Sequence, residues 1–158
     1  MGLKRILLVE DSANDAELIL AALSENNLAN EVVVVRDGEE ALDYLYRRGM
    51  FRLRLEGNPA VVLLDLKLPK VDGLEVLAQL KSDPEMKGIP IVVLTSSREE
   101  PDLIRSYNLG TNAYVVKPVH FYEFVDAIKG LGLFWAVINQ PPPDSLPPAL
   151  GSQQVEMP

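Results

Sequence analysis

Five short apolar runs separated by amphipathic segments limit the possible folds of this chain more than any other feature. Each run is rich in β-branched residues and is bounded by turn formers or charges; the runs are RILLV (5–9), VVVV (32–35), VVLL (61–64), IVVL (91–94) and AYVV (113–116). Continuous apolarity without alternation is typical of parallel strands that are covered on both faces. The pattern therefore predicts five buried parallel strands.

Helical patterns fill the intervals between these strands. They lie at roughly 14–26, 38–48, 73–82, 99–108 and 121–137. Ser12 followed by Asp15 has the spacing of a capping box at the start of the first helix. Strands alternating with helices predict an α/β fold, a (βα)5 doubly wound sheet of five parallel strands in the flavodoxin-like order 2-1-3-4-5, with helices on both faces.

Composition bounds the domain organisation and the partners. Six of the twelve prolines fall in the last twenty residues, so we expect one domain over 1–138 and a Pro-rich, disordered tail over 139–158. The absence of cysteine excludes disulfides and zinc–thiolate sites. A net charge of −8 argues against a nucleic-acid partner. No apolar run is long enough for a signal peptide or a membrane span, which favours a cytoplasmic protein without a membrane anchor.

An arginine-rich stretch, YRRGMFRLRLEG, interrupts this acidic chain. It contains Arg47, Arg48, Arg52 and Arg54. We favour the interpretation that these side chains cover a solvated helix end and loop. The alternative is a docking patch for an acidic protein surface.

Carboxylates follow two of the predicted strands. Glu10 and Asp11 end the first strand, and Asp65 follows the third. In the order 2-1-3-4-5 these strands are neighbours at the point where the strand order reverses, which is where doubly wound sheets bind ligands. Carboxylates held so close either share a proton or bind a hard cation such as Mg²⁺. A carboxylate left free by the metal can act as a nucleophile toward a phosphoryl group.

Phosphate-handling groups follow the last two strands. Thr95 begins a hydroxyl cluster after the fourth strand, and Lys117 follows the fifth strand and precedes Pro118. A hydroxyl can donate to a phosphoryl oxygen, and a lysine supplies a point charge for it. The strand ends together predict a site for phosphoryl transfer.

With these residues in place, the chain resembles the receiver domain of two-component response regulators, of the type that includes the chemotaxis regulators. The spacing agrees as well, with 30 residues from Asp65 to Thr95 and 52 from Asp65 to Lys117. The segment DLKLPKVDG places Pro69 four and Gly73 eight residues after the acid, as in the family. The resemblance covers about residues 4–138, and five concordant motifs in order make it specific.

The resemblance implies a role for each matching residue. Asp65 would accept a phosphoryl group from a sensor histidine kinase, and Lys117 would neutralise its charge, with a cis bond to Pro118. Mg²⁺, for which Mn²⁺ can substitute, would be held directly by Asp11, Asp65 and the backbone carbonyl of Lys67, and by Glu10 through water. The side chain of Lys67 would influence how long the phosphoryl group lasts, in a direction that the sequence leaves open.

The resemblance also implies a switch and an output surface. Thr95 would move toward the phosphoryl group and Tyr114 would turn inward, which changes the surface of the fourth helix, fifth strand and fifth helix. The apolar residues of the segment FYEFVDAIKGLGLFWAVI exceed what one helix face buries, so we expect a homodimer along this surface, through Phe124, Ile128, Leu131, Phe134 and Trp135. The alternative is that the helix ends at Gly130 and Gly132 and the segment folds back onto the core.

Other functions fit the residues less well. An aspartyl-phosphate hydrolase would need a second Asp at position 67, which is Lys, and an FMN-binding loop would not be acidic at EDSAND. A pseudo-receiver that binds partners without phosphorylation remains the alternative. With no folded segment after the receiver, we expect a single-domain response regulator that signals by protein–protein contact and is not an enzyme. The stretch before the third strand and the FW pair are similar to regulators that partner phytochromes, which suggests a bacteriophytochrome histidine kinase as the donor.

Overall fold

The computed structural model of the chain describes residues 5–23, 31–54, 57–96 and 101–130. Its centre is a five-stranded parallel sheet in the order β2-β1-β3-β4-β5, which confirms the predicted topology. The strands are β1 (Ile6–Val9), β2 (Val32–Val35), β3 (Val61–Asp65), β4 (Ile91–Thr95) and β5 (Ala113–Val116).

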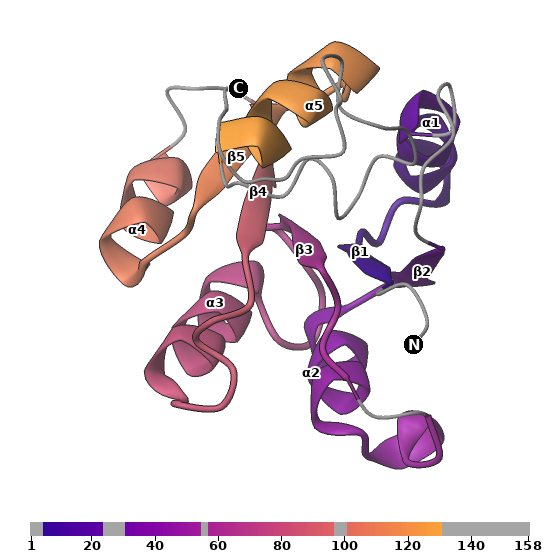
Figure 1. The fold of residues 1–158 in the computed structure, drawn as a ribbon, viewed down its shortest axis with the longest axis vertical. Coiled ribbons are helices and arrows are strands. Elements are labelled where there is room, and N and C mark those ends of the chain that lie inside the picture. Colours follow the sequence, from indigo (N-terminus) through magenta and orange to yellow (C-terminus); the bar gives the residue numbers. More distant parts are fainter. Residues whose placement is uncertain (1–4, 24–30, 55–56, 97–100, 131–158) are drawn as a thin grey trace, which may run out of the picture.

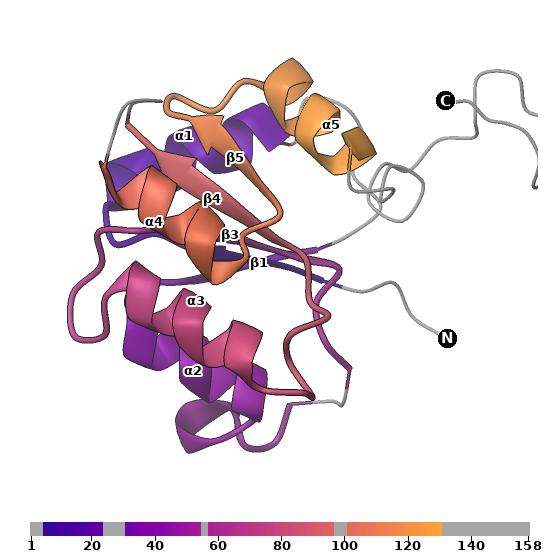
Figure 2. The same cartoon turned by 90° about the vertical axis from the view of Figure 1, so that its left-hand side faces the viewer.

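Five α-helices cover the sheet. They are α1 (Ala13–Leu23), α2 (Gly38–Tyr46), α3 (Gly73–Ser82), α4 (Pro101–Leu109) and α5 (Phe121–Gly130), and a short 3₁₀ helix, η1 (Gly49–Phe51), follows α2. Helices α1 and α5 lie on one face and α2 and α3 on the other, while α4 packs beside α3 (Figures 1 and 2). The sequence did not predict η1. None of the helices in the described ranges is both long and apolar enough to cross a bilayer.

The continuous apolar runs are explained by the two covered faces. In β1, Ile6 and Leu8 pack with α1 and α5, whereas Leu7 and Val9 pack with α2 and α3. All four side chains are fully buried. Since neighbouring side chains of a strand point to opposite faces, a strand buried on both faces has no polar positions, and the sequence pattern shows no alternation.

Helix α5 corrects one prediction. Phe124 is 1% exposed and packs in the core with α1 and the sheet, so its assignment to a dimer interface is wrong. The apolar periodicity of a helix does not show which of its residues face the sheet. Ile128 belongs to α5, but its side chain lies outside the described part of the structure, as do Leu131, Phe134, Trp135 and the tail over 139–158.

In the arginine-rich stretch, Arg47, Arg48 and Arg52 are exposed, as the favoured interpretation expects, and Arg54 departs from it. Arg54 is partly buried: its Nε donates to the carbonyl of Tyr44 at 2.6 Å and its Nη1 donates to the carbonyl of Gly57 at 2.9 Å. Its guanidinium lies 4.2 Å from the centre of the Tyr44 ring. Arg54 therefore joins α2 to the chain that leads into β3, and it is a structural residue and not a solvated charge.

Candidate functional site

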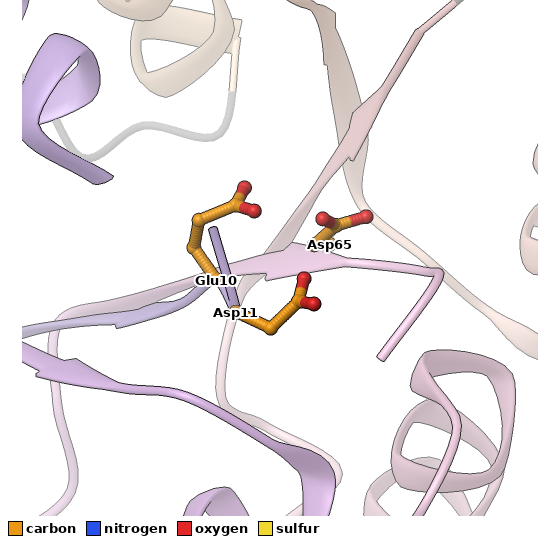
Figure 3. A group of neighbouring side chains, drawn as sticks. All are labelled: Glu10, Asp11 and Asp65. Atoms are coloured by element: carbon orange, nitrogen blue, oxygen red, sulfur yellow. The ribbon is translucent and has the colours of Figure 1, made fainter. Parts of the chain in front are cut away.

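Three carboxylates meet at the carboxyl edge of the sheet. One oxygen each from Glu10, Asp11 and Asp65 lies within 4.8 Å of the other two, and Figure 3 shows the three side chains gathered where β1 and β3 end. The adjacency follows from the sheet register, because Val9 pairs with Leu64 and the next residue of each chain segment is an acid, Glu10 after β1 and Asp65 at the end of β3. The predicted convergence of these three residues is confirmed.

The end of β3 is held by a close approach of helix α3. Gly73 donates its N–H to the carbonyl of Leu66 at 3.0 Å, and a Cβ on Gly73 would lie 2.5 Å from the carbonyl oxygen of Asp65. Only glycine leaves room for this contact. The N–H of Lys67 donates to Asp65 Oδ1 at 3.1 Å. Together these contacts fix the carboxylate of Asp65 at the rim of the sheet, and the exposed side chain of Lys67 points away from the core.

Lys117 places a positive charge among the acids. Its Nζ lies 3.0 Å from Asp65 Oδ2, 2.8 Å from Glu10 Oε1 and 3.4 Å from Asp15 Oδ2. The peptide bond between Lys117 and Pro118 is cis, as the family resemblance implies. The predicted meeting of Lys117 with Asp65 is confirmed across 52 residues of sequence.

Burial and charge shift the pKa values of this pair. Burial raises the pKa of Glu10 to about 7, although Lys117 partly offsets the effect. Burial alone would lower the pKa of Lys117, but the carboxylates of Glu10 and Asp65 outweigh it and raise the pKa above its ordinary value. The ammonium is therefore charged at neutral pH, whereas the charge on Glu10 is costly in the metal-free protein.

The donor set fits a hard divalent cation. Carboxylate oxygens are the ligands that Mg²⁺ and Mn²⁺ take from proteins. Glu10 Oε1 is buried and, despite its ionic contact with Lys117, has no aligned hydrogen bond among the described residues. A carboxylate oxygen in this position can accept a further hydrogen bond, so the role of Glu10 through a metal-bound water stays a prediction that the donor set permits. The acidic cluster can therefore hold a divalent metal ion.

The two predicted switch residues lie on neighbouring strands. Thr95 is 2% exposed at the end of β4, and its carbonyl accepts the N–H of Lys117 at 2.7 Å. Tyr114 is half-buried on β5, packs against a small cluster that includes Leu66 and Leu103, and meets the ring of Tyr107 edge to face with centroids 6.1 Å apart. Tyr114 thus connects the strand that carries Lys117 to helix α4.

Sequence reasoning missed one member of the site. Asp15 was predicted only as a capping residue of α1, yet its carboxylate reaches Lys117, which is 102 residues away. The signal available in the sequence was an acid in the first turn of the helix that follows the acidic strand end. Spacing within α1 cannot show that this side chain turns toward β5.

Comparisons with known proteins agree with this geometry. Residues 6–129 match the model of the response regulator receiver domain. Response regulator Rcp1 of Synechocystis sp. is 41% identical over 132 residues, which cover 84% of this chain and 88% of Rcp1. A solved structure of the Mn²⁺-bound form of response regulator Rcp1 covers 84% of this chain and 94% of its own, with a TM-score of 0.68 at 41% identity.

Two further solved structures are more similar in sequence. The bacteriophytochrome response regulator RtBRR is 65% identical, with a TM-score of 0.80, over 89% of this chain and 85% of RtBRR. The bacteriophytochrome response regulator AtBRR is 61% identical, with a TM-score of 0.82, over 89% of this chain and 100% of AtBRR. The similarity therefore extends over nearly all of the described residues.

Proposed function

This chain belongs to the response regulator receiver domain family and acts in phosphorylation-based two-component signalling, and from this premise we propose that Asp65 is its phosphoryl acceptor. The observation that carries the assignment is that Asp65 is the one described acid that combines contact with Lys117, access from solvent and a place in the acidic cluster, which Asp15 lacks. The side chain of Asp65 is 12% exposed and lies 3.0 Å from Lys117 Nζ. Glu10 shares the lysine, but its side chain is only 1% exposed, so a phosphoryl donor cannot reach it.

The acidic cluster would hold Mg²⁺ during the reaction. Asp11 and Asp65 would be direct ligands together with the backbone carbonyl of Lys67, and Glu10 would act through a water molecule. The bound ion would offset the negative charge that gathers on the phosphoryl oxygens. Mn²⁺, which the Rcp1 structure contains, would serve in its place because it takes the same oxygen ligands.

The residues of the chain perform the remaining steps. A carboxylate oxygen of Asp65 forms a bond to phosphorus as the bond from phosphorus to the histidine nitrogen of the kinase breaks, and that nitrogen keeps the electron pair. The ammonium of Lys117 contacts the transferred group and stabilises its charge. The chain would thus assist its own phosphorylation and dephosphorylation and would not act as an enzyme on a separate substrate.

Phosphorylation would be read out through β4 and β5. The Thr95 hydroxyl would move toward the new phosphoryl oxygens, and Tyr114 would turn inward from its half-buried position beside Tyr107. The change would alter the surface of α4, β5 and α5, where Tyr107 is 46% and Tyr122 is 78% exposed. Exposed aromatic side chains favour a protein partner at this surface, and a second copy of the chain is the partner we propose.

A bacteriophytochrome histidine kinase is the donor we propose. The support is the similarity to two bacteriophytochrome response regulators at 65% and 61% identity. A cytoplasmic location would follow from this partnership.

A comparison of three proteins tests the role of Asp65. The wild type, Asp65→Asn and the control Asp126→Asn, which removes an exposed acid of α5, are incubated with acetyl phosphate or phosphoramidate, with and without Mg²⁺, and weighed by mass spectrometry. We expect the wild type and Asp126→Asn to gain one phosphoryl group when Mg²⁺ is present and Asp65→Asn to gain none. A wild type that stays unmodified would favour the phosphorylation-independent pseudo-receiver instead.

A further inference from the structure

Lys117 contacts one carboxylate more than phosphoryl transfer on Asp65 requires. Asp65 is the proposed acceptor and Glu10 belongs to the metal cluster, but Asp15 lies on α1 and outside that cluster. Asp15 Oδ2 is 3.4 Å from Lys117 Nζ, and the Asp15 side chain is 40% exposed. The ammonium is thus shared between the interior of the site and an acid at its rim.

The start of α1 explains why Asp15 is available to the lysine. In a capping box, the acid at the third helical position accepts the backbone N–H of the capping residue. Ser12 does accept the N–H of Asp15 through its Oγ at 3.1 Å, but the N–H of Ser12 itself donates to Glu10 Oε2 at 3.2 Å. Glu10 thus accepts the N–H of Ser12 that Asp15 would accept in a capping box. The carboxylate of Asp15 accepts from Lys117 instead.

The charges of the site give this contact a consequence. Among the described residues at the site, Glu10, Asp11, Asp15 and Asp65 can each carry a negative charge, against the one positive charge of Lys117. A phosphoryl group on Asp65 adds further negative charge and needs the same ammonium. Asp15 therefore opposes the phosphorylated state in two ways, by attracting the lysine away from it and by direct repulsion.

Resting on the proposed function, we infer that Asp15 is a positioning residue that competes with the phosphoryl group for Lys117 and so weakens phosphoryl binding at Asp65. Asp15 does not touch the reacting atoms; it acts through the lysine.

The test measures the affinity of the Mg²⁺-loaded protein for beryllofluoride, an anionic mimic of the phosphoryl group that binds an acceptor carboxylate. Asp15→Asn removes the charge and keeps the shape, and Glu17→Gln is the control because it removes one charge from an exposed position of the same helix. We expect Asp15→Asn to tighten beryllofluoride binding about threefold to tenfold, with a matching fall in the half-saturating concentration of acetyl phosphate. Glu17→Gln should change both by much less.

A second measurement shows whether the effect passes through the lysine. In protein labelled with ¹⁵N and ¹³C at lysine, the Lys117 side-chain signal, assigned with Lys117→Gln, should shift in Asp15→Asn and stay in place in Glu17→Gln. An affinity gain without that shift would overturn the role of Asp15, as would equal affinities for the two variants. A wild type that binds no beryllofluoride would contradict the proposed function itself. A wild type that binds it, with no difference between the two variants, would contradict only the role of Asp15.

Discussion

Two partly buried lysines at opposite edges of the sheet have opposite surroundings. Lys117, at the carboxyl edge, contacts three carboxylates. Lys81, in the last turn of α3, donates its Nζ to three uncharged oxygens: the carbonyls of Lys87 and Ile89 at 3.2 Å and Asn112 Oδ1 at 3.1 Å. These acceptors precede β4 and β5, so Lys81 lies at the amino edge.

The two sets of partners shift the pKa of the lysines in opposite directions. Burial lowers the pKa of Lys81, whereas the carboxylates around Lys117 overcome burial and raise its pKa. At the amino edge the ammonium donates to two backbone carbonyls before β4 and to one side-chain oxygen before β5. At the carboxyl edge the described carboxylates outnumber the single described ammonium, that of Lys117. The resulting excess of negative charge favours the binding of a metal cation. The comparison suggests that one edge serves stability and the other serves chemistry.

The largest effect should come from removing the charge at the carboxyl edge. Lys117→Gln removes the cation that we propose stabilises the transferred phosphoryl group, and we expect phosphorylation by acetyl phosphate to slow by about a hundredfold or more. Lys81→Gln, its matched control, should leave that rate within about twofold because the oxygens around Lys81 are remote from Asp65. Mass spectrometry over time measures both rates. Equal losses of phosphorylation rate in the two variants would contradict the assignment of chemistry to the carboxyl edge alone.

Glycines extend the comparison to the backbone. A Cβ at Gly73 would lie 2.5 Å from the Asp65 carbonyl and the Leu66 Cα, whereas a Cβ at Gly88, before β4, would meet nothing within 4 Å. We expect Gly73→Ala to lower the free energy of unfolding by about 2–4 kcal/mol, because backbone and not a flexible side chain must move. Gly88→Ala should change it by less than about 1 kcal/mol. Urea unfolding of both variants checks this, and a tolerated Gly73→Ala would show that β3 can shift freely.

The carboxyl edge could be predicted from the sequence because its residues follow apolar runs. Asp65 ends β3 and Lys117 directly follows β5, and parallel strands bring their carboxyl ends to one edge whatever the loops between them do. Strand order and the acidic cluster follow from the same pattern. Local rules of this kind do not depend on side-chain rotamers.

Contacts set by side-chain direction could not be predicted. Asp15 has the spacing of a capping residue, but Glu10 takes the N–H that it would accept. Phe124 has the periodicity of an exposed strip, but it faces the sheet. Arg54 stacks on Tyr44 only because the turn after α2 brings the chain back over that ring. Each outcome depends on the three-dimensional course of the chain and not on residue spacing.

The pH dependence of stability offers a third test, in the metal-free protein. Burial raises the pKa of Glu10 from 4.5 to about 7 in the folded state, so folding favours its neutral form. Protonated Glu10 therefore contributes stability that is fully present below pH 4.5 and is lost as the pH rises through about 7. The free energy of unfolding falls by roughly 2–3 kcal/mol over this range. Lys117, with its raised pKa, stays charged throughout this window.

Glu10→Gln isolates that contribution. The free energy of unfolding in urea and EDTA is measured for the wild type and the variant from pH 4.5 to 7.5. We expect the variant to gain stability relative to the wild type as the pH rises, because glutamine carries no charge to bury. A constant difference would mean that Glu10 ionises at its ordinary pKa, and that the carboxyl edge is less strained electrostatically than the geometry implies.

The smallest effect concerns the amino edge itself. Lys81→Met keeps the aliphatic stem and removes the donors, so the carbonyls of Lys87 and Ile89 and the side-chain oxygen of Asn112 lose one hydrogen bond each. Asn112 still accepts the N–H of Ile91 at 2.8 Å, and exposed oxygens can bond to water instead, so we expect a loss of about 1 kcal/mol in the free energy of unfolding. Lys81→Arg should recover part of it, because a guanidinium also supplies several donors. If Lys81→Met instead slowed phosphorylation, Lys81 would be coupled to the opposite edge through α3, whose first residue contacts Asp65, and the two edges would not be independent.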